Sequence, residues 1–283
     1  MGQMVWEATV PPPAVTAGPP AIELRDVTKR FRTPSGDIYT ALRDLNLSVG
    51  AGEFVSVVGP TGCGKSTTLA LISGLTPASS GEVLVQGKPV DGIGDNLGYV
   101  FQGDVLFPWK SVLGNVSSGL RFRGVTKKEA QERAREWIAK VGLSGFEDHY
   151  PHQLSGGMRK RTALAQSLIT SPEIILMDEP FSALDVQTRA LMEDELLDLW
   201  SATSASVVFV THDLEEAIAL SDRVFVLTAG PGTVKGDYRV DLPRPRNAAE
   251  IRFSPEFQRI YGEIWEDLRD EVLVSYERAK RAG

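Results

Sequence analysis

The sequence feature that most constrains this chain is the stretch FVSVVGPTGCGKST at residues 54–67. A short β-branched run leads into the pattern Gly-x-x-x-x-Gly-Lys-Ser, which is typical of a strand followed by a phosphate-binding loop and a helix. Loop N–H groups then form an anion site at the helix N-terminus, while Lys65 reaches the β- and γ-phosphates and Ser66 ligates Mg²⁺. A glycine-rich turn with a chance Lys-Ser pair is the alternative, but the helical LALISG that follows argues against it. The predicted nucleoside triphosphate site comprises Gly59, Pro60, Thr61, Gly62, Cys63, Gly64, Lys65, Ser66 and Thr67.

The composition is that of an ordinary globular protein, with 283 residues, 42% apolar and 24% charged. This length suffices for one large domain or two small ones. No apolar run approaches the ~20 residues that a membrane-spanning helix needs, and residues 1–10 lack the features of a secretory signal. A net charge of −7 argues against a general nucleic-acid-binding protein. The single Cys excludes an internal disulfide and is typical of a reducing cytosol.

Hydrophobic patterning divides the chain into a tail, a core domain and an extension. Residues 1–20 are rich in proline and predict a disordered or extended tail, with a Pro-rich partner ligand as the alternative. Residues 21–49 alternate between apolar and polar side chains, which predicts an antiparallel β layer. We therefore predict an α/β fold, in which a phosphate-loop core carries this β layer and an inserted α-helical subdomain. The core domain spans 21–242, the helical subdomain about 103–170, and a C-terminal helical extension 243–283. Within the subdomain, Thr126 and Glu129 predict a helix start, and one helix face holds Ala130, Ala134, Trp137, Ile138 and Val141.

Two carboxylates end the apolar run at residues 174–177. A phosphate-loop enzyme needs an acidic residue at a neighbouring strand end to hold Mg²⁺, and a group that orients and deprotonates water. Asp178 is the candidate for the first role and Glu179 for the second. Two solvated carboxylates at a strand end are the alternative interpretation.

The segment Leu154-Ser155-Gly156-Gly157 opens a predicted helix. A Ser and two Gly residues at a helix N-terminus make a second anion site. Two anion sites in one chain indicate either two ligands or one ligand that is shared between two copies of the chain.

The order of these motifs resembles that of the ATP-binding cassette (ABC) ATPases. The phosphate loop is followed by Gln102, LSGGM at 154–158, ILMDE at 175–179, SALD at 182–185 and THD at 211–213. The resemblance covers about residues 21–240 and is specific because all these motifs coincide. It implies a phosphate-loop ATPase that works as a head-to-tail homodimer or with a close paralogue. ATP and Mg²⁺ on one subunit's phosphate loop would be capped by the LSGG segment of the second subunit.

The resemblance also implies roles for side chains outside the phosphate loop. Phe31 would stack on the adenine, with Tyr39 as the reserve candidate. Gln102 would contact Mg²⁺ or the attacking water and sense the γ-phosphate. The other implied roles are Glu179 as general base, His212 as the γ-phosphate contact that positions the water, Asp178 as a Mg²⁺ ligand, Ser155, Gly156 and Gly157 as phosphate contacts, and Asp185 at the dimer seam.

One position departs from the family pattern. The commonest signature of the family ends in Gln, whereas this chain has Met158. The Ser and Gly residues of the signature carry the phosphate contact, so we expect activity to survive.

The segments 102–109, 154–161, 178–185 and 227–232 look like the cassettes of bacterial importers for nitrate, sulfonate, taurine and related small anions. The resemblance implies a peripheral protein on the cytoplasmic face of the inner membrane. It would drive transmembrane permease subunits, which dock near the Gln102–Trp109 region, and would serve a substrate-binding protein only indirectly. Nucleic acid is not expected as a partner.

Two other functions stay open. The chain could power an exporter or a lipid transporter, or it could be a soluble ABC ATPase that acts on nucleic acid or ribosomes. The second alternative calls for a long coiled-coil insertion or tandem cassettes, and the sequence has neither.

Four features permit two interpretations each. Cys63 is a small packing residue or a reactive thiol that ATP protects. The basic run 159–161 is a solvated helix face, or else a nucleotide or partner contact. The Phe107-Pro108-Trp109 segment is a partner anchor or a satellite core. A short final helix, with Ser254 as its N-cap and an apolar face up to Leu268, packs on the core or forms a partner site.

Overall fold

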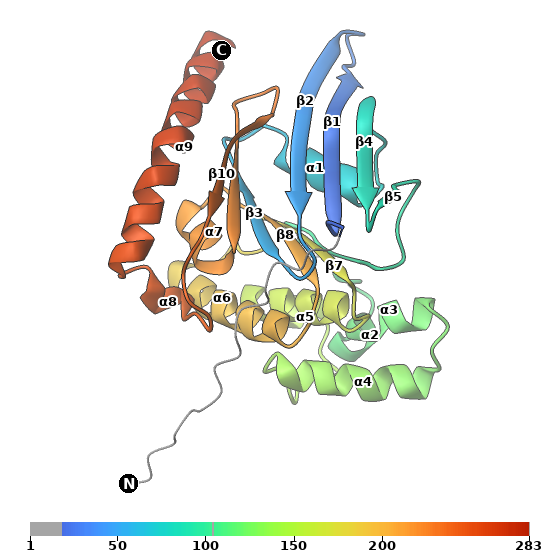
Figure 1. Cartoon of the computed structure of the whole chain (residues 1–283). Helices are drawn as coiled ribbons and strands as arrows, with labels where there is room; N and C mark the ends of the chain where they lie inside the picture. The colour runs from blue at the N-terminus through green and yellow to red at the C-terminus, as the bar shows by residue number, and fades with distance from the viewer. Residues whose placement is uncertain (1–18, 104, 283) are drawn as a thin grey trace.

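The computed structural model describes residues 19–103 and 105–282 and shows two β-sheets with helices around them (Figure 1). Most of the predicted tail, residues 1–18, lies outside the described residues. The α/β fold with an antiparallel layer that the sequence predicts is confirmed.

The antiparallel sheet has the strand order β2-β1-β4-β5. Its two long strands bury some side chains and expose others because one face packs on the core and the other meets solvent, although neither strand alternates strictly along its length. The four strands are β1 (Ile22–Arg32), β2 (Ile38–Val49), β4 (Ser80–Val85) and β5 (Lys88–Pro89).

The second sheet has the order β10-β9-β3-β8-β7-β6 and is parallel except at β10. Every residue of β3 and β8 is buried, as expected of a parallel sheet covered on both faces. The sequence analysis missed β10. The strands are β3 (Phe54–Val58), β6 (Leu97–Val100), β7 (Ile174–Asp178), β8 (Ser206–Val210), β9 (Arg223–Leu227) and β10 (Val234–Arg239).

A group of helices between β6 and β7 forms its own apolar cluster, which lies to one side of the sheets in Figure 1. The Thr126 side chain caps α4, which buries Ala130, Ala134 and Ile138 on the face that the sequence predicts. The elements of this group are α2 (Val112–Val116), α3 (Ser118–Phe122), α4 (Lys127–Lys140), the 3₁₀ turn η1 (Pro151–Gln153) and α5 (Gly156–Leu168).

The last helix, α9 (Pro255–Ala282), runs for 28 residues beside β9 and β10 (Figure 1). Its first half packs on the core through Phe257, Ile260, Ile264 and Leu268, as expected from the sequence. Our expectation of a short helix was wrong, because the helix continues well beyond this apolar stretch. Within the described residues, no helix combines the length and apolarity that crossing a bilayer requires. The remaining helices are α1 (Lys65–Ile72), α6 (Val186–Ser201), α7 (Leu214–Leu220) and α8 (Ala248–Ile251).

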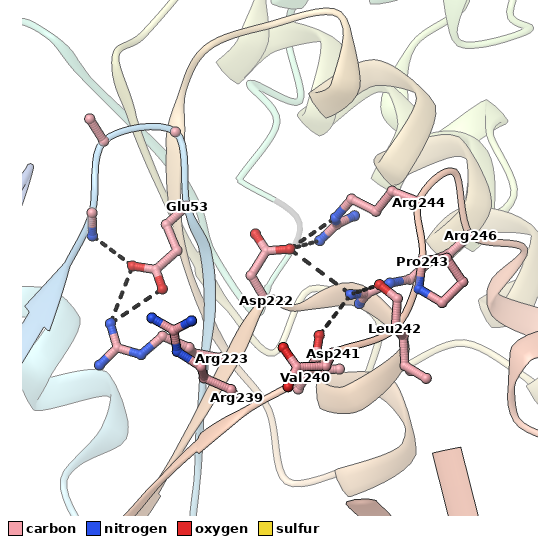
Figure 2. Close-up of a pocket in the computed structure, with 13 residues that line it drawn as sticks. Glu53, Asp222, Arg223, Arg239, Val240, Asp241, Leu242, Pro243, Arg244 and Arg246 are labelled. Atoms are coloured by element: carbon pink, nitrogen blue, oxygen red, sulfur yellow. Dashed lines mark hydrogen bonds and ion pairs between the residues drawn. The ribbon is translucent and has the colours of Figure 1, made fainter. Parts of the chain in front are cut away.

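A cavity of about 560 Å³ lies where β3 and β9 begin. Three of its arginines have protein partners (Figure 2). Arg223 pairs with Glu53 at 3.2 Å, and Arg244 pairs with Asp222 at 2.7 Å. The side chain of Arg246 is only 1% exposed, and burial lowers its pKa. Its two Nη atoms donate to the backbone carbonyls of Ile218, Ala219, Ser221, Val240 and Leu242.

We expect Arg246→Met to lower the free energy of unfolding by about 3 kcal/mol, because the carbonyls at the end of α7 lose their buried donors. Arg239 lines the same cavity but is exposed, so Arg239→Met should change the free energy by less than about 0.5 kcal/mol. Urea denaturation measures both values. Similar stabilities for the two variants would contradict the role of Arg246.

Candidate functional site

The candidate site lies at the carboxyl ends of β3, β7 and β8, where the phosphate loop, the two carboxylates and the His212 segment follow their strands. This is the edge at which open α/β sheets bind their ligands. It encloses a cavity of about 570 Å³. The cavity is lined by Phe31, Tyr39, Ala41, Thr61, Gly62, Gly64, Lys65, Ser66, Thr67, Gln102, Glu179 and His212.

The phosphate loop presents an uncompensated helix N-terminus to this cavity. Helix α1 has no acidic residue in its first turn, and its N-cap Gly64 has a φ of 105° without a side-chain cap. The N–H groups of the first turn are therefore open to an anion. Lys65 is buried, and its Nζ donates to the carbonyls of Gly59 at 2.8 Å and Pro60 at 3.3 Å.

Cys63 turns its side chain away from this ligand site and into the protein. Its side chain belongs to the apolar cluster between the sheets, and Cys63 does not line the nucleotide cavity. Burial raises the pKa of its thiol. These observations favour the packing interpretation over the reactive thiol.

Ser66 and Asp178 come from different elements but meet at one point. The hydroxyl of Ser66 donates to Oδ1 of Asp178 at 3.0 Å, and burial raises the pKa of this carboxyl. Oxygen donors of this kind suit Mg²⁺, which binds one or two protein groups together with substrate phosphates. The described residues hold no cluster of three or more His, Cys, Asp or Glu that could bind a metal, and the pair fits an ion completed by nucleotide.

Glu179 is the point at which three predicted residues converge. Its Oε2 lies 3.0 Å from Nδ1 of His212 and accepts from Nε2 of Gln102 at 3.3 Å. Glu179 has a positive φ of 42°, an uncommon conformation for a non-glycine residue and one that clusters at functional sites. Its N–H donates to the carbonyl of Val210 at 2.8 Å, which holds the strained residue beside β8.

The side chain of Lys160 hydrogen-bonds to the backbone of Gln102, a contact that the sequence analysis missed. The interpretation of residues 159–161 as a solvated helix face is wrong for this residue, because Lys160 is buried. Its Nζ donates to the carbonyl of Gln102 at 2.6 Å. A Lys at the third position after two glycines gives no hint of this contact in the sequence, because the partner lies 58 residues away in the chain.

Both adenine candidates stand at the mouth of the cavity. Phe31 and Tyr39 are paired across β1 and β2, and they are 40% and 48% exposed. The hydroxyl of Tyr39 donates to the carbonyl of Gly62 at 3.3 Å. An aromatic wall beside the phosphate loop is therefore present, and both rings contribute to it.

The signature segment is not brought into this cavity. Ser155 caps α5 by accepting from the N–H of Met158, and Asp185 caps α6 by accepting from the N–H of Thr188. Neither these two residues nor Gly156 and Gly157 line the cavity. The two predicted anion sites of the chain are thus separate within one copy.

A buried polar layer lies behind His212 and was also missed by the sequence analysis. The hydroxyl of Thr211 hydrogen-bonds to the carboxyl of Glu216, which is 3% exposed. Asp213 caps α7 and pairs with Arg189 at 2.8 Å. Burial raises the pKa of Glu216 to about 8.

This layer predicts how stability depends on pH. Because the folded-state pKa of Glu216 lies above its ordinary value of 4.5, the native state holds a proton that the unfolded chain has lost between about pH 4.5 and 8. The free energy of unfolding therefore falls as pH rises through this window. Burial raises the pKa of neighbouring Glu193 to about 7, and Glu193 contributes with the same sign.

We expect Glu216→Gln to flatten this fall by up to about 1 kcal/mol per pH unit. Denaturant unfolding at several pH values between 5 and 8 provides the test. Glu136→Gln, at an exposed position of α4, is the control and should keep the wild-type slope. Parallel curves for the wild type and Glu216→Gln would show that Glu216 does not titrate in this way.

Known proteins were compared with the chain at the level of sequence. The family model described as ABC transporter matches residues 42–182. An uncharacterized ABC transporter ATP-binding protein of Methanocaldococcus jannaschii is 48% identical over 254 residues, which make up 90% of this chain and 93% of the relative. The nitrate import ATP-binding protein NrtD of Synechocystis is 42% identical and the taurine import ATP-binding protein TauB of Burkholderia pseudomallei 43%. These two alignments cover 88% and 82% of this chain, and 95% and 91% of the relatives.

A solved structure supports the same relationship. It is the dimeric, post-hydrolysis state of an ATP-binding cassette bound to ADP and phosphate, 34% identical to this chain, with a TM-score of 0.69. The match covers 77% of this chain and 98% of the solved one. The chain therefore belongs to the ATP-binding proteins of the ABC transporter family and is an ATPase of that family.

Proposed function

We propose that this ATPase is the motor subunit of an ABC importer for a small anion such as nitrate, a sulfonate or taurine. The observation that carries the proposal is the convergence of Gln102 and His212 on Glu179 beside the phosphate loop, a geometry suited to activating water. The anion class is supported by the similarity to the nitrate and taurine import proteins.

The proposed reaction is in-line attack of water on the γ-phosphate of ATP. The phosphate-loop N–H groups and Lys65 bind the phosphates, and Phe31 or Tyr39 stacks on the adenine. Mg²⁺, held by Ser66 and Asp178, would neutralise phosphate charge. Glu179 accepts the proton of the attacking water, while Gln102 and His212 orient the water and the γ-phosphate.

The proposed working unit is a head-to-tail dimer with a second copy or a close paralogue. Ser155, Gly156 and Gly157 lie outside the nucleotide cavity of their own chain, yet they form an exposed helix N-terminus suited to phosphate. A second subunit would bring this segment over the bound ATP and place Asp185 at the seam. Met158 packs partly against the helical cluster, which leaves Ser155 and the glycines as the phosphate contacts.

The proposed docking surface for a permease subunit lies beside Gln102. A cavity of about 510 Å³ there is lined in part by Phe101, Val105, Phe107 and Phe122. Phe107 is half-buried between Phe122 and the neighbouring Trp109, whose side chain is 71% exposed. Exposed aromatic groups around an apolar groove are typical of interaction sites. Docking here would hold the protein on the cytoplasmic face of the inner membrane, with any substrate-binding protein acting only through the permease.

Glu179→Gln should bind ATP with near wild-type affinity but hydrolyse it at least ~10²-fold more slowly, because the amide cannot accept the proton of water. Phosphate release measures turnover, and nucleotide fluorescence measures binding. Turnover close to that of the wild type would remove Glu179 from the role of general base.

Lys65→Ala should instead weaken binding itself, because a buried positive charge beside the phosphate site is lost. We expect the Kd for ATP to rise at least ~10-fold. Lys88→Ala, at an exposed position of β5, is the matched control and should bind like the wild type. An unchanged Kd for Lys65→Ala would contradict the phosphate contact.

The importer assignment is tested by isolating tagged Glu179→Gln protein from detergent-solubilised native membranes with ATP and Mg²⁺. A stoichiometric multi-spanning protein, identified by mass spectrometry, is the expected result, and Trp109→Ala should reduce its yield. Recovery of cassette dimers alone, or of ribosomal or DNA-bound proteins, would leave the ATPase intact and overturn the transporter function. An exporter or lipid transporter as partner would overturn only the import direction.

A further inference from the structure

The second half of α9 hydrogen-bonds to three backbone groups at Ala229 and Gly230, in the turn that follows β9. Oε2 of Glu271 accepts from the N–H of Ala229 at 2.7 Å. Two helical turns further along, Nη1 of Arg278 donates to the carbonyls of Ala229 and Gly230. Both polar groups of the Ala229 backbone are therefore satisfied by one helix. Glu271 is itself fixed by Lys235 of β10, whose Nζ lies 3.0 Å from Oε1.

The turn from 228 to 233 is rigid in itself. Thr228 and Thr233 are linked by a backbone hydrogen bond of 3.0 Å, and the hydroxyl of Thr228 both donates to the carbonyl of Pro231 and accepts from the N–H of Thr233. These bonds tie together the two ends of the turn that contains Ala229 and Gly232.

On its other side, the same turn packs closely against the phosphate loop at Gly232. At Gly232 a Cβ atom would lie 2.0 Å from the carbonyl oxygen of Cys63, so only glycine permits this approach. Gly232 also exchanges hydrogen bonds with β2, donating to Ala41 at 2.8 Å and accepting from Arg43 at 2.9 Å. The turn thus contacts α9 on one side and the phosphate loop on the other.

The phosphate loop, the turn and α9 also line one cavity together. A cavity of about 460 Å³ is lined by Thr61 and Gly62 of the phosphate loop, by Gly230 and Pro231 of the turn, and by Arg278 of α9. It also shares Tyr39 with the nucleotide cavity. Arg278 of α9 therefore lines a cavity that the phosphate loop also lines.

We propose that Glu271 and Arg278 are positioning residues for ATP binding, which act through the turn at 228–233 to hold the phosphate loop in its phosphate-binding conformation. A loop held in place before the ligand arrives loses less conformational freedom on binding. The effect falls on nucleotide affinity rather than on the chemical step, because Glu179 and His212 are attached to other strands.

The apolar packing of α9 involves other residues than its hydrogen bonds to the turn. Among the side chains of α9 whose burial the structure describes, the buried ones are Phe257, Ile260, Ile264 and Leu268, all in its first half. Beyond them, Val272 and Leu273 are 42% and 54% exposed. Changes at Glu271 or Arg278 therefore leave the apolar anchor of the helix in place.

The test compares Glu271→Ala, Arg278→Ala and Glu271→Gln for MgATP affinity, ATPase kinetics and melting temperature. Each alanine variant should raise the Kd and the KM for MgATP roughly three- to tenfold, the factor expected for a lost hydrogen bond, with kcat within about twofold of the wild type. Glu271→Gln keeps an acceptor for the Ala229 N–H and should recover most of the affinity. The double variant Arg259→Ala, Glu263→Ala removes an exposed ion pair from the same helix and should bind like the wild type.

Nucleotide affinity within twofold of the wild type in both alanine variants would overturn the proposal. A fall in kcat with an unchanged KM would do the same, since the residues would then act on the chemistry. Equal weakening in the Arg259, Glu263 control would assign the effect to the stability of the helix instead. If Glu271→Ala does not fold, Arg278→Ala decides alone, because Arg278 is exposed.

Discussion

The candidate site depends on the register of the parallel strands, because the register makes their carboxyl ends meet at one edge of the sheet. Val210 of β8 pairs with Val57 on one side and with Asp178 on the other. This register brings the start of the phosphate loop, the two carboxylates and the His212 segment to one edge of the sheet. The interaction between Ser66 and Asp178 spans 112 residues of sequence, and it exists only because these backbone ladders align their strands.

Within one chain the proposed catalytic groups are assembled, but the proposed enclosure is incomplete. Gln102 and His212 both contact Glu179, whereas the signature segment caps its own helix away from the cavity. The buried hydrogen bond between Thr211 and Glu216 supports the His212 segment, and buried Lys160 supports the Gln102 segment. This arrangement fits the proposal that hydrolysis requires the signature segment of a second subunit.

Sequence patterns predicted the elements whose apolar spacing or turn chemistry is strong. The strand before the phosphate loop, the carboxylate pair after β7 and the Thr126 cap of α4 are examples. The short edge strand β10 and α8 were missed, because their sequences carry no regular hydrophobic period. The length of α9 was underestimated for a related reason, since its second half is held by Glu271 and Arg278 rather than by apolar side chains.

The sequence by itself determined the phosphate loop, its neighbouring acids and hence the ATPase chemistry, because these depend on residue types at fixed short spacings. Only the tertiary structure decided which distant groups support them. Lys160 beneath Gln102, Glu216 behind His212 and α9 against the turn at Gly232 are contacts between elements far apart in the chain. Such pairs arise from packing and strand register, which no local pattern encodes.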